Sequence, residues 1–114
     1  MTTIEQTALT NLIHNEQYAR KVLPFIKGDY FSDRTERIVF EEIQKFVDKY
    51  NALPNKNSLE VELDSRKDLN EDDYKRVLSV VKSLQTDDDV NFEWLVETTE
   101  QFCKDKAVYN AIVD

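Results

Sequence analysis

Histidine and cysteine, which most often bind metals or support nucleophilic catalysis, occur once each, as His14 and Cys103. A structural zinc site needs about four such ligands, and a nucleophilic side chain needs a base beside it. His14 has no second ligand at metal-binding spacing, and we predict that it lies near the surface at a helix end. Cys103 falls on the apolar stripe of the last expected helix, so we predict a buried, unreactive thiol. No catalytic residue and no metal site are predicted.

The acidic runs match the calcium-binding loop of an EF-hand only in part. Counting from Asp68, oxygen-bearing residues occupy the first, third and fifth positions, but the sixth is Asp73 and the twelfth is Ser79. Counting from Asp89, the sixth position is Trp94. An EF-hand needs glycine at the sixth position for its sharp turn. These acidic stretches are therefore interpreted as solvated helix N-caps.

The sequence contains a single glycine in 114 residues, which excludes nucleotide-binding loops that depend on several glycines. Average use would place roughly eight, and phosphate-cradling loops and dinucleotide turns need several to let the backbone approach a ligand. Hairpin-rich β folds also depend on glycine in their turns. The composition therefore predicts a helical domain that binds no nucleotide or other cofactor by itself.

The charge balance bears on partners and compartment. The formal net charge is -8, and the basic residues come mostly in twos rather than in long runs, so we predict no tight DNA binding by this chain alone. The single cysteine is compatible with a reducing cytoplasm. The N-terminus lacks the basic and apolar blocks of a signal peptide, and no apolar stretch approaches the roughly 20 residues of a membrane span. We predict a soluble intracellular protein.

Six helices are expected from capping residues and apolar periodicity, in one small orthogonal all-α bundle. Tyr30 and Phe31, just before the third helix, are expected to pack in the core rather than to stack on a nucleic-acid base. The third helix is expected to bury a stripe that reaches Tyr50. The expected helices are 4–14, 16–23, 34–50, 58–65, 71–84 and a long last one over 91–114. The expected caps are Thr3 with Gln6 or else Thr2 with Glu5, Asp33 with Glu36, Asn57 with Glu60, Asn70, and the acidic run 87–89 before the last helix.

The last helix carries the candidate contact residues. It has no terminal glycine or proline, so we expect it to lead into a linker in a longer protein. Trp94 stands off its apolar stripe and is a candidate anchor for a partner. Lys106 is a cation on that stripe, and either an edge position in water or pairing with a carboxylate between helices fits it. The candidates for contact with a partner or another copy are Trp94, Phe102, Lys106, Tyr109, Ile112 and Val113.

Three motifs resemble a known family. They are Asp29-Tyr30-Phe31, the stretch Trp94-Leu95-Val96-x-x-Thr99-Glu100, and Ala107-x-x-Asn110-Ala111. With the order of the helices, they resemble the N-terminal domain of DnaB-type replicative helicases, most closely the form found in T-even-like bacteriophages. The resemblance covers nearly the whole chain and rests on apolar spacings rather than on catalytic signatures.

The resemblance implies that residues 1–114 form the collar domain of a larger helicase. In this family the collar domains pair as a trimer of dimers on a ring-shaped hexamer and contact the primase and, in many members, the helicase loader. An ATPase motor domain absent from this chain would bind ATP and Mg²⁺, and DNA would be held only by the full-length hexamer. The host bacterium's cytoplasm is the compartment implied for a phage protein of this kind.

Two other classes of protein remain open. One is a free-standing acidic helical adaptor, complete at this length. The other is an acidic protein that mimics DNA to inhibit a nucleic-acid enzyme, which the interspersed lysines and arginines disfavour. The coding sequence after Asp114 would discriminate, because only the helicase reading predicts a phosphate-binding G-x-x-x-x-G-K-[ST] motif downstream.

Overall fold

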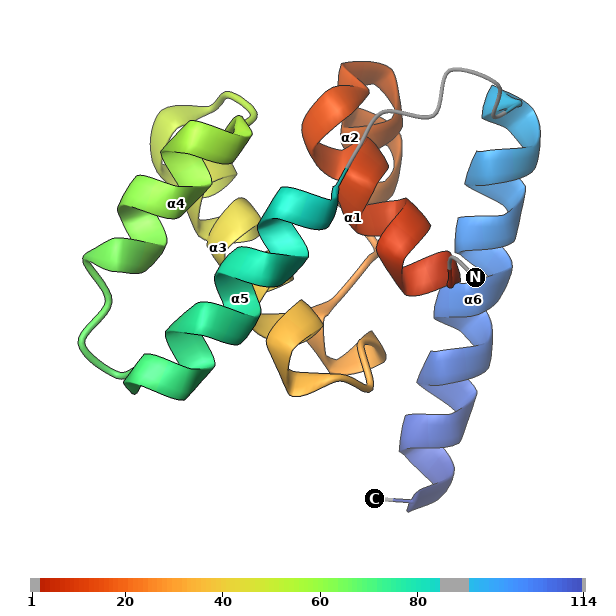
Figure 1. The fold of residues 1–114 in the computed structure, drawn as a ribbon. Helices are drawn as coiled ribbons and strands as arrows, with labels where there is room; N and C mark the ends of the chain where they lie inside the picture. The colour runs from red at the N-terminus through yellow and green to blue at the C-terminus, as the bar shows by residue number, and fades with distance from the viewer. Residues whose placement is uncertain (1–2, 85–90, 114) are drawn as a thin grey trace.

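The computed structural model describes residues 3–84 and 91–113, and throughout these residues the regular structure is helical. The predicted all-α class is therefore confirmed. Figure 1 shows the chain order of the elements. They are α1 (Ile4–His14), α2 (Glu16–Val22), the 3-10 helix η1 (Gly28–Tyr30), α3 (Arg34–Tyr50), α4 (Lys56–Asp64), α5 (Glu71–Ser83) and α6 (Phe92–Val113). The acidic run 87–89, predicted as a signal before the last helix, lies outside the described residues.

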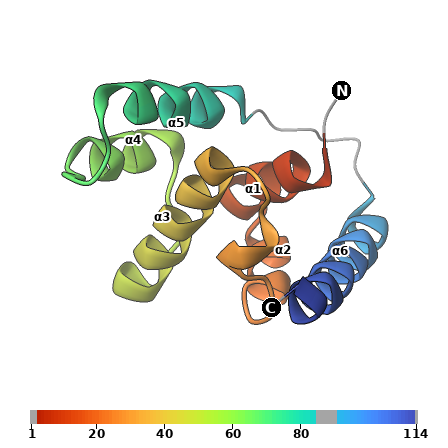
Figure 2. The same cartoon turned by 90° about the horizontal axis from the view of Figure 1, so that it is seen from below.

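The helices are arranged around a central group formed by α1, α2 and α3. α4 and α5 pack on one side of this group, through α3, while α6 packs on the other, against α1, α2 and η1 (Figure 2). None of the described helices combines the length and the apolar character needed to cross a membrane. The arrangement leaves α6 with one face on the bundle and one face free.

An aromatic cluster joins η1, α3 and α6 in the core. Phe31 is completely buried, and its ring stacks on Phe40 at a centroid distance of 5.1 Å. The ring of Phe102 meets Phe31 edge-on at 6.2 Å. Tyr30 is buried next to this cluster, which confirms the core position predicted for the Tyr30-Phe31 pair.

A buried hydroxyl pair joins α2 to α6. The Tyr18 hydroxyl lies 2.7 Å from Thr99 Oγ1, which is also 2.7 Å from the carbonyl oxygen of Leu95. Both side chains are fully buried. Burial raises the pKa of Tyr18 to about 12, although its hydrogen bond to Thr99 acts in the opposite direction. The phenol thus stays neutral and satisfied inside the bundle.

Two of the predicted caps differ from the structure. Thr3 and Gln6 form the predicted capping box of α1. At α3, Asp33 accepts from Thr35 N instead, at 2.7 Å, and Glu36 is buried rather than closing a box. Burial is the main cause that raises the pKa of Glu36, followed by the charges of Asp33 and Glu5. The Glu36 side chain packs into the bundle and does not make the capping-box hydrogen bond that was predicted with Asp33.

The start of α4 also differs from the prediction. The helix begins at Lys56, two residues earlier than expected, and Asn55 rather than Asn57 is its cap. Asn55 Oδ1 accepts from Ser58 N at 2.8 Å. The sequence analysis did not consider Asn55, which lies two residues before the predicted cap, as a capping residue. The second helix ends at Val22, one residue before the predicted end.

The last turn of α3 is less buried than predicted. Tyr50 is 49% exposed, and its ring rests on Phe46 of the same helix at 4.7 Å rather than in the core. Asn51 then ends the helix with a left-handed backbone, at φ 51°. Of the predicted stripe, Val39 and Ile43 are buried and Val47 packs against the core, whereas Phe46 and Tyr50 lie outside it.

Residues 68–79 adopt a capped helix rather than a calcium loop. α5 begins at Glu71, so most of the twelve positions of the hypothetical EF-hand loop are helical. Asn70 Oδ1 accepts from Asp73 N at 2.7 Å, as expected of an N-cap. This confirms the interpretation as an N-cap.

Replacing Asn70 by alanine is expected to lower the free energy of unfolding by about 1 kcal/mol, because it removes this cap. Urea denaturation followed by circular dichroism at 222 nm measures the loss. Asn70→Asp is the matched control, since aspartate caps as well as asparagine, and should retain wild-type stability. Equal losses in both variants would contradict a capping role.

Candidate interaction surface

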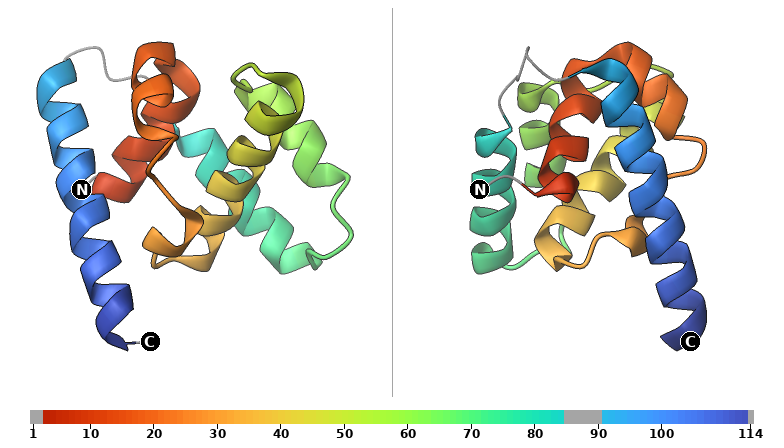
Figure 3. Two further views of the ribbon diagram at one scale, coloured as in Figure 1. Left: turned by 180° about the vertical axis from the view of Figure 1, so that it is seen from behind. Right: turned by 90° about the vertical axis from the view of Figure 1, so that its right-hand side faces the viewer.

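The free end of α6 exposes four large apolar side chains in two consecutive turns. Ile112 is 76% exposed, and Val108, Tyr109 and Val113 are 60% exposed each. We call these four residues the α6 tail. Figure 3 shows that this end of the helix extends past the rest of the bundle, in both views. The four apolar side chains of the tail are left uncovered by the described elements, whereas Leu95, Val96 and Thr99 in the first half of α6 are buried.

Two polar contacts hold the base of the tail against the segment around η1. Lys106 Nζ donates to Ser32 Oγ at 2.9 Å, and Asn110 Nδ2 donates to the carbonyl oxygen of Asp29 at 3.3 Å. The Lys106 ammonium also lies 5.9 Å from the centre of the Tyr109 ring, within the range of a cation–π contact. These contacts orient the start of the tail without covering its apolar surface.

Lys106 has a partner that neither sequence reading specified. Among the described residues its contact is a hydroxyl, that of Ser32, and not a carboxylate. Lys106 does lie between two separate segments of the chain, as the prediction of pairing between helices required. The partner is 74 residues away in the chain, beyond the reach of any helical pattern.

The other two candidates fall in different places. Phe102 is buried against Phe31, so it belongs to the core and not to the exposed surface. Trp94 is 54% exposed, as its position off the stripe predicted. Eighteen residues separate Trp94 from Ile112, about five full helical turns, so both side chains leave α6 in the same direction. Trp94 and the tail therefore mark the two ends of one exposed side of α6.

A groove lies on another flank of α6 and was not predicted. It has a volume of about 290 Å³, and it is lined by Phe25, Tyr30, Glu100, Cys103, Lys104 and Ala107. Burial, and then the nearby charge of Glu100, raise the pKa of the Cys103 thiol to about 11, which keeps it protonated at neutral pH. The buried position predicted for Cys103 is confirmed. The groove was missed because its two walls are far apart in sequence and only packing brings them together.

His14 lies at the end of α1 and is exposed, as predicted. Its Nε2 is 3.1 Å from the carbonyl oxygen of Leu84, the residue that follows α5. Within residues 3–84 and 91–113, no three histidine, cysteine, aspartate or glutamate side chains gather in a way that could hold a metal ion.

The described surface thus combines an exposed apolar helix end with a groove beside α6. The chain belongs to the DnaB-like helicase N-terminal domain family, whose model matches residues 1–101. It is also 30% identical, over 103 residues, to a DnaB-like replicative helicase of Enterobacteria phage T4. That alignment covers 90% of this chain but only 21% of the relative, so the chain spans about a fifth of that protein's length.

Proposed function

We propose that this chain is the N-terminal assembly and docking domain of a phage replicative DNA helicase, acting in the cytoplasm of the bacterial host. The α6 tail is the observation that carries the proposal. Four adjacent, exposed apolar side chains on one helix end form a surface that another copy of the chain can cover. The family match and the resemblance to a phage replicative helicase support the same assignment.

In this proposal the domain supplies contacts and a separate motor domain supplies the chemistry. The tail joins copies of the chain, which supports assembly of a hexamer. The primase, and a helicase loader where one is used, dock on the collar that the joined domains form. ATP and Mg²⁺ belong to the motor domain, and DNA is held by the hexamer rather than by this acidic domain.

The charge distribution disfavours the alternative of a DNA mimic. Lysines and arginines are interspersed among the acidic residues, and some of the surface carboxylates are paired with cations, as in Glu16 with Arg20 and Asp73 with Arg34. A mimic of the phosphate backbone requires unneutralised negative charges in regular spacing. A free-standing adaptor would use the same apolar surface but would not need copies of itself.

Tyr109→Asp combined with Val113→Asp is expected to weaken self-association of the 114-residue chain at least tenfold, which corresponds to about 1.4 kcal/mol. Two carboxylates would have to be desolvated in any contact made through the tail. Sedimentation equilibrium over a range of concentrations measures the association constant, and circular dichroism checks that the bundle remains folded.

The matched control is Tyr50→Asp combined with Val61→Asp. These are the same residue types, also exposed, on α3 and α4, and the control should associate like the wild type. Aspartate near a helix C-terminus also interacts unfavourably with the helix dipole, which could destabilise α6 itself. Tyr109→Lys with Val113→Lys avoids this effect and should weaken association equally. A wild-type chain that remains monomeric, or tail variants that associate normally, would contradict the proposal.

A further inference from the structure

One exposed side of α6 carries apolar residues at its two ends and polar residues between them. Trp94 and Ile112 are the ends, 54% and 76% exposed. Gln101 and Asp105 are exposed between them, and they leave the helix in nearly the same direction as the ends because seven residues make about two turns. The order is symmetric about position 103, from which Trp94 and Ile112 each lie nine residues away. Gln101 and Asp105 each lie two residues from it. A helix face with this symmetry can match a second copy of itself that runs in the opposite direction.

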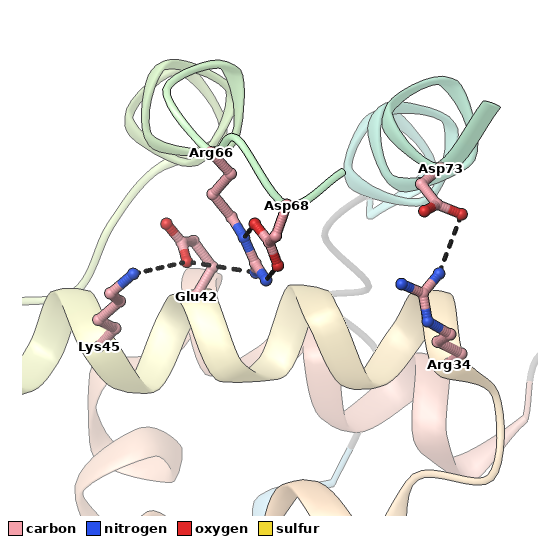
Figure 4. Close-up of polar contacts among 6 residues, drawn as sticks. All are labelled: Arg34, Glu42, Lys45, Arg66, Asp68 and Asp73. Atoms are coloured by element: carbon pink, nitrogen blue, oxygen red, sulfur yellow. Dashed lines mark hydrogen bonds and ion pairs between the residues drawn. The ribbon is translucent and has the colours of Figure 1, made fainter. Parts of the chain in front are cut away.

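Several charged groups on the opposite side of the bundle are paired within the chain. Arg34 Nη1 lies 2.9 Å from Asp73 Oδ1, and Arg66 donates hydrogen bonds to Asp68 (Figure 4). On α6 the situation differs, because no carboxylate of this helix takes part in an ion pair with another residue that the structure describes. The charges of α6 are therefore available to decide how a second copy can approach.

These charges favour one direction for a pair of α6 helices. In a parallel pair each residue faces its own copy, so Glu97 would oppose Glu97 and Asp105 would oppose Asp105. Like charges placed opposite each other cost free energy. In an antiparallel pair centred on position 103, Asp105 faces Gln101 instead. Gln101 Nε2 already donates one hydrogen to Asp105 Oδ1 of its own chain at 2.8 Å, and its second N–H can donate to the carboxylate of the other copy. A shift by one turn would lose this match and bring Glu97 level with Asp105.

We propose that two copies of the chain pair through α6 in antiparallel orientation, with Trp94 of each copy packed on Ile112 of the other. This inference rests on the proposed function, because it specifies how the α6 tail joins copies of the chain. The indole covers part of the apolar surface that the bundle leaves exposed, and it does so at both ends of the pair. Each bundle lies on the outer side of its own α6, because the opposite face of the helix packs on α1 and α2.

Trp94 is the single tryptophan of the chain, so its fluorescence reports the contact directly. On dilution of the 114-residue chain, the emission maximum should shift to longer wavelength and quenching by acrylamide should increase. Both changes should occur at the concentrations where sedimentation equilibrium shows the pair to dissociate. Association without any change in Trp94 emission would overturn the antiparallel pair and leave the proposed function intact. A chain that stays monomeric would overturn both.

Two complementary variants, Trp94→Glu and Ile112→Lys, test the facing residues without fluorescence. Each charge suits the helix dipole at its own end of α6, so circular dichroism should show both variants folded. Each variant alone loses both apolar contacts and should associate about tenfold more weakly than the wild type. In an equal mixture, the mixed pair keeps one Trp94–Ile112 contact and gains one ion pair between glutamate and lysine. The mixed pair should therefore outnumber both self-pairs in native mass spectrometry.

The matched control replaces Ile112→Lys by Val61→Lys, which places the same charge on an exposed apolar position of α4. Mixed with Trp94→Glu, this control leaves one glutamate facing Ile112 and gains no ion pair. Its mixed pair should therefore not exceed the self-pair of Val61→Lys. A mixture of Trp94→Glu and Ile112→Lys that behaves like the control would overturn the antiparallel pair.

Discussion

Replacing Phe31 by alanine is expected to lower the free energy of unfolding by about 3 to 5 kcal/mol. The Phe31 ring is completely buried between Phe40 of α3 and Phe102 of α6, so its removal leaves a cavity that two separate elements line. Neither neighbour can fill this space without losing its own packing. Because a domain of this size is stabilised by only about 5–15 kcal/mol, the variant should be close to the limit of folding at 37 °C.

Urea denaturation, with helicity followed at 222 nm, measures this effect. Phe46→Ala is the control, because Phe46 rests on the half-exposed Tyr50 rather than in the central cluster, and should cost about 1 kcal/mol. Phe31→Leu keeps much of the volume and should fall between the two. A loss for Phe31→Ala no larger than that of the control would show that the cluster does not hold α6 to the bundle.

Replacing Thr99 by valine is expected to lower the free energy of unfolding by about 1 to 3 kcal/mol. Valine has nearly the same shape but leaves the buried hydroxyl of Tyr18 without its partner. Adding Tyr18→Phe removes that unsatisfied hydroxyl, so the double variant should recover most of the loss. A double variant as unstable as the sum of both single variants would contradict a coupled hydroxyl pair.

The same pair predicts a loss of stability at alkaline pH. The pKa of Tyr18 is 10.0 in its ordinary state and about 12 in the folded chain, so the unfolded chain releases this proton more readily. The associated stabilisation is complete below pH 10 and is lost as pH rises through about 12, by about 2 to 3 kcal/mol. In Tyr18→Phe this component should be absent. The measurement is the difference in unfolding free energy between wild type and Tyr18→Phe from pH 8 to the highest pH at which both still fold.

Local interactions made most of the helices predictable. The bounds of α1 agree with the sequence prediction, and the Thr3 and Asn70 caps act through residues three positions away. Such contacts depend only on the nearby chain, so periodicity and capping residues report them directly. At α4 the local pattern failed, because Asn57 was predicted as the cap and the structure uses Asn55, two residues earlier.

The candidate surface was predictable only in part. Helical periodicity separated the exposed Trp94 from the buried Cys103, and Tyr109, Ile112 and Val113 were predicted because they lie on the last turns of α6. Val108, which is equally exposed, was missed. The same reasoning placed Phe102 among the contact candidates, although its ring completes the aromatic core. Periodicity gives the direction in which a side chain leaves its helix, but it does not show where the neighbouring elements end.

The sequence by itself determined the helical class, most helix bounds, the family resemblance and the expectation of a domain without catalytic groups. Only the tertiary structure decided that Lys106 binds Ser32, that Glu36 and Glu42 are buried, and that segments around Phe25 and Cys103 line one groove. Lys106 and Ser32, for example, are 74 positions apart in the chain. Helical patterns arise from hydrogen bonds and contacts within about four residues, whereas burial and long-range partners depend on how complete helices pack against one another.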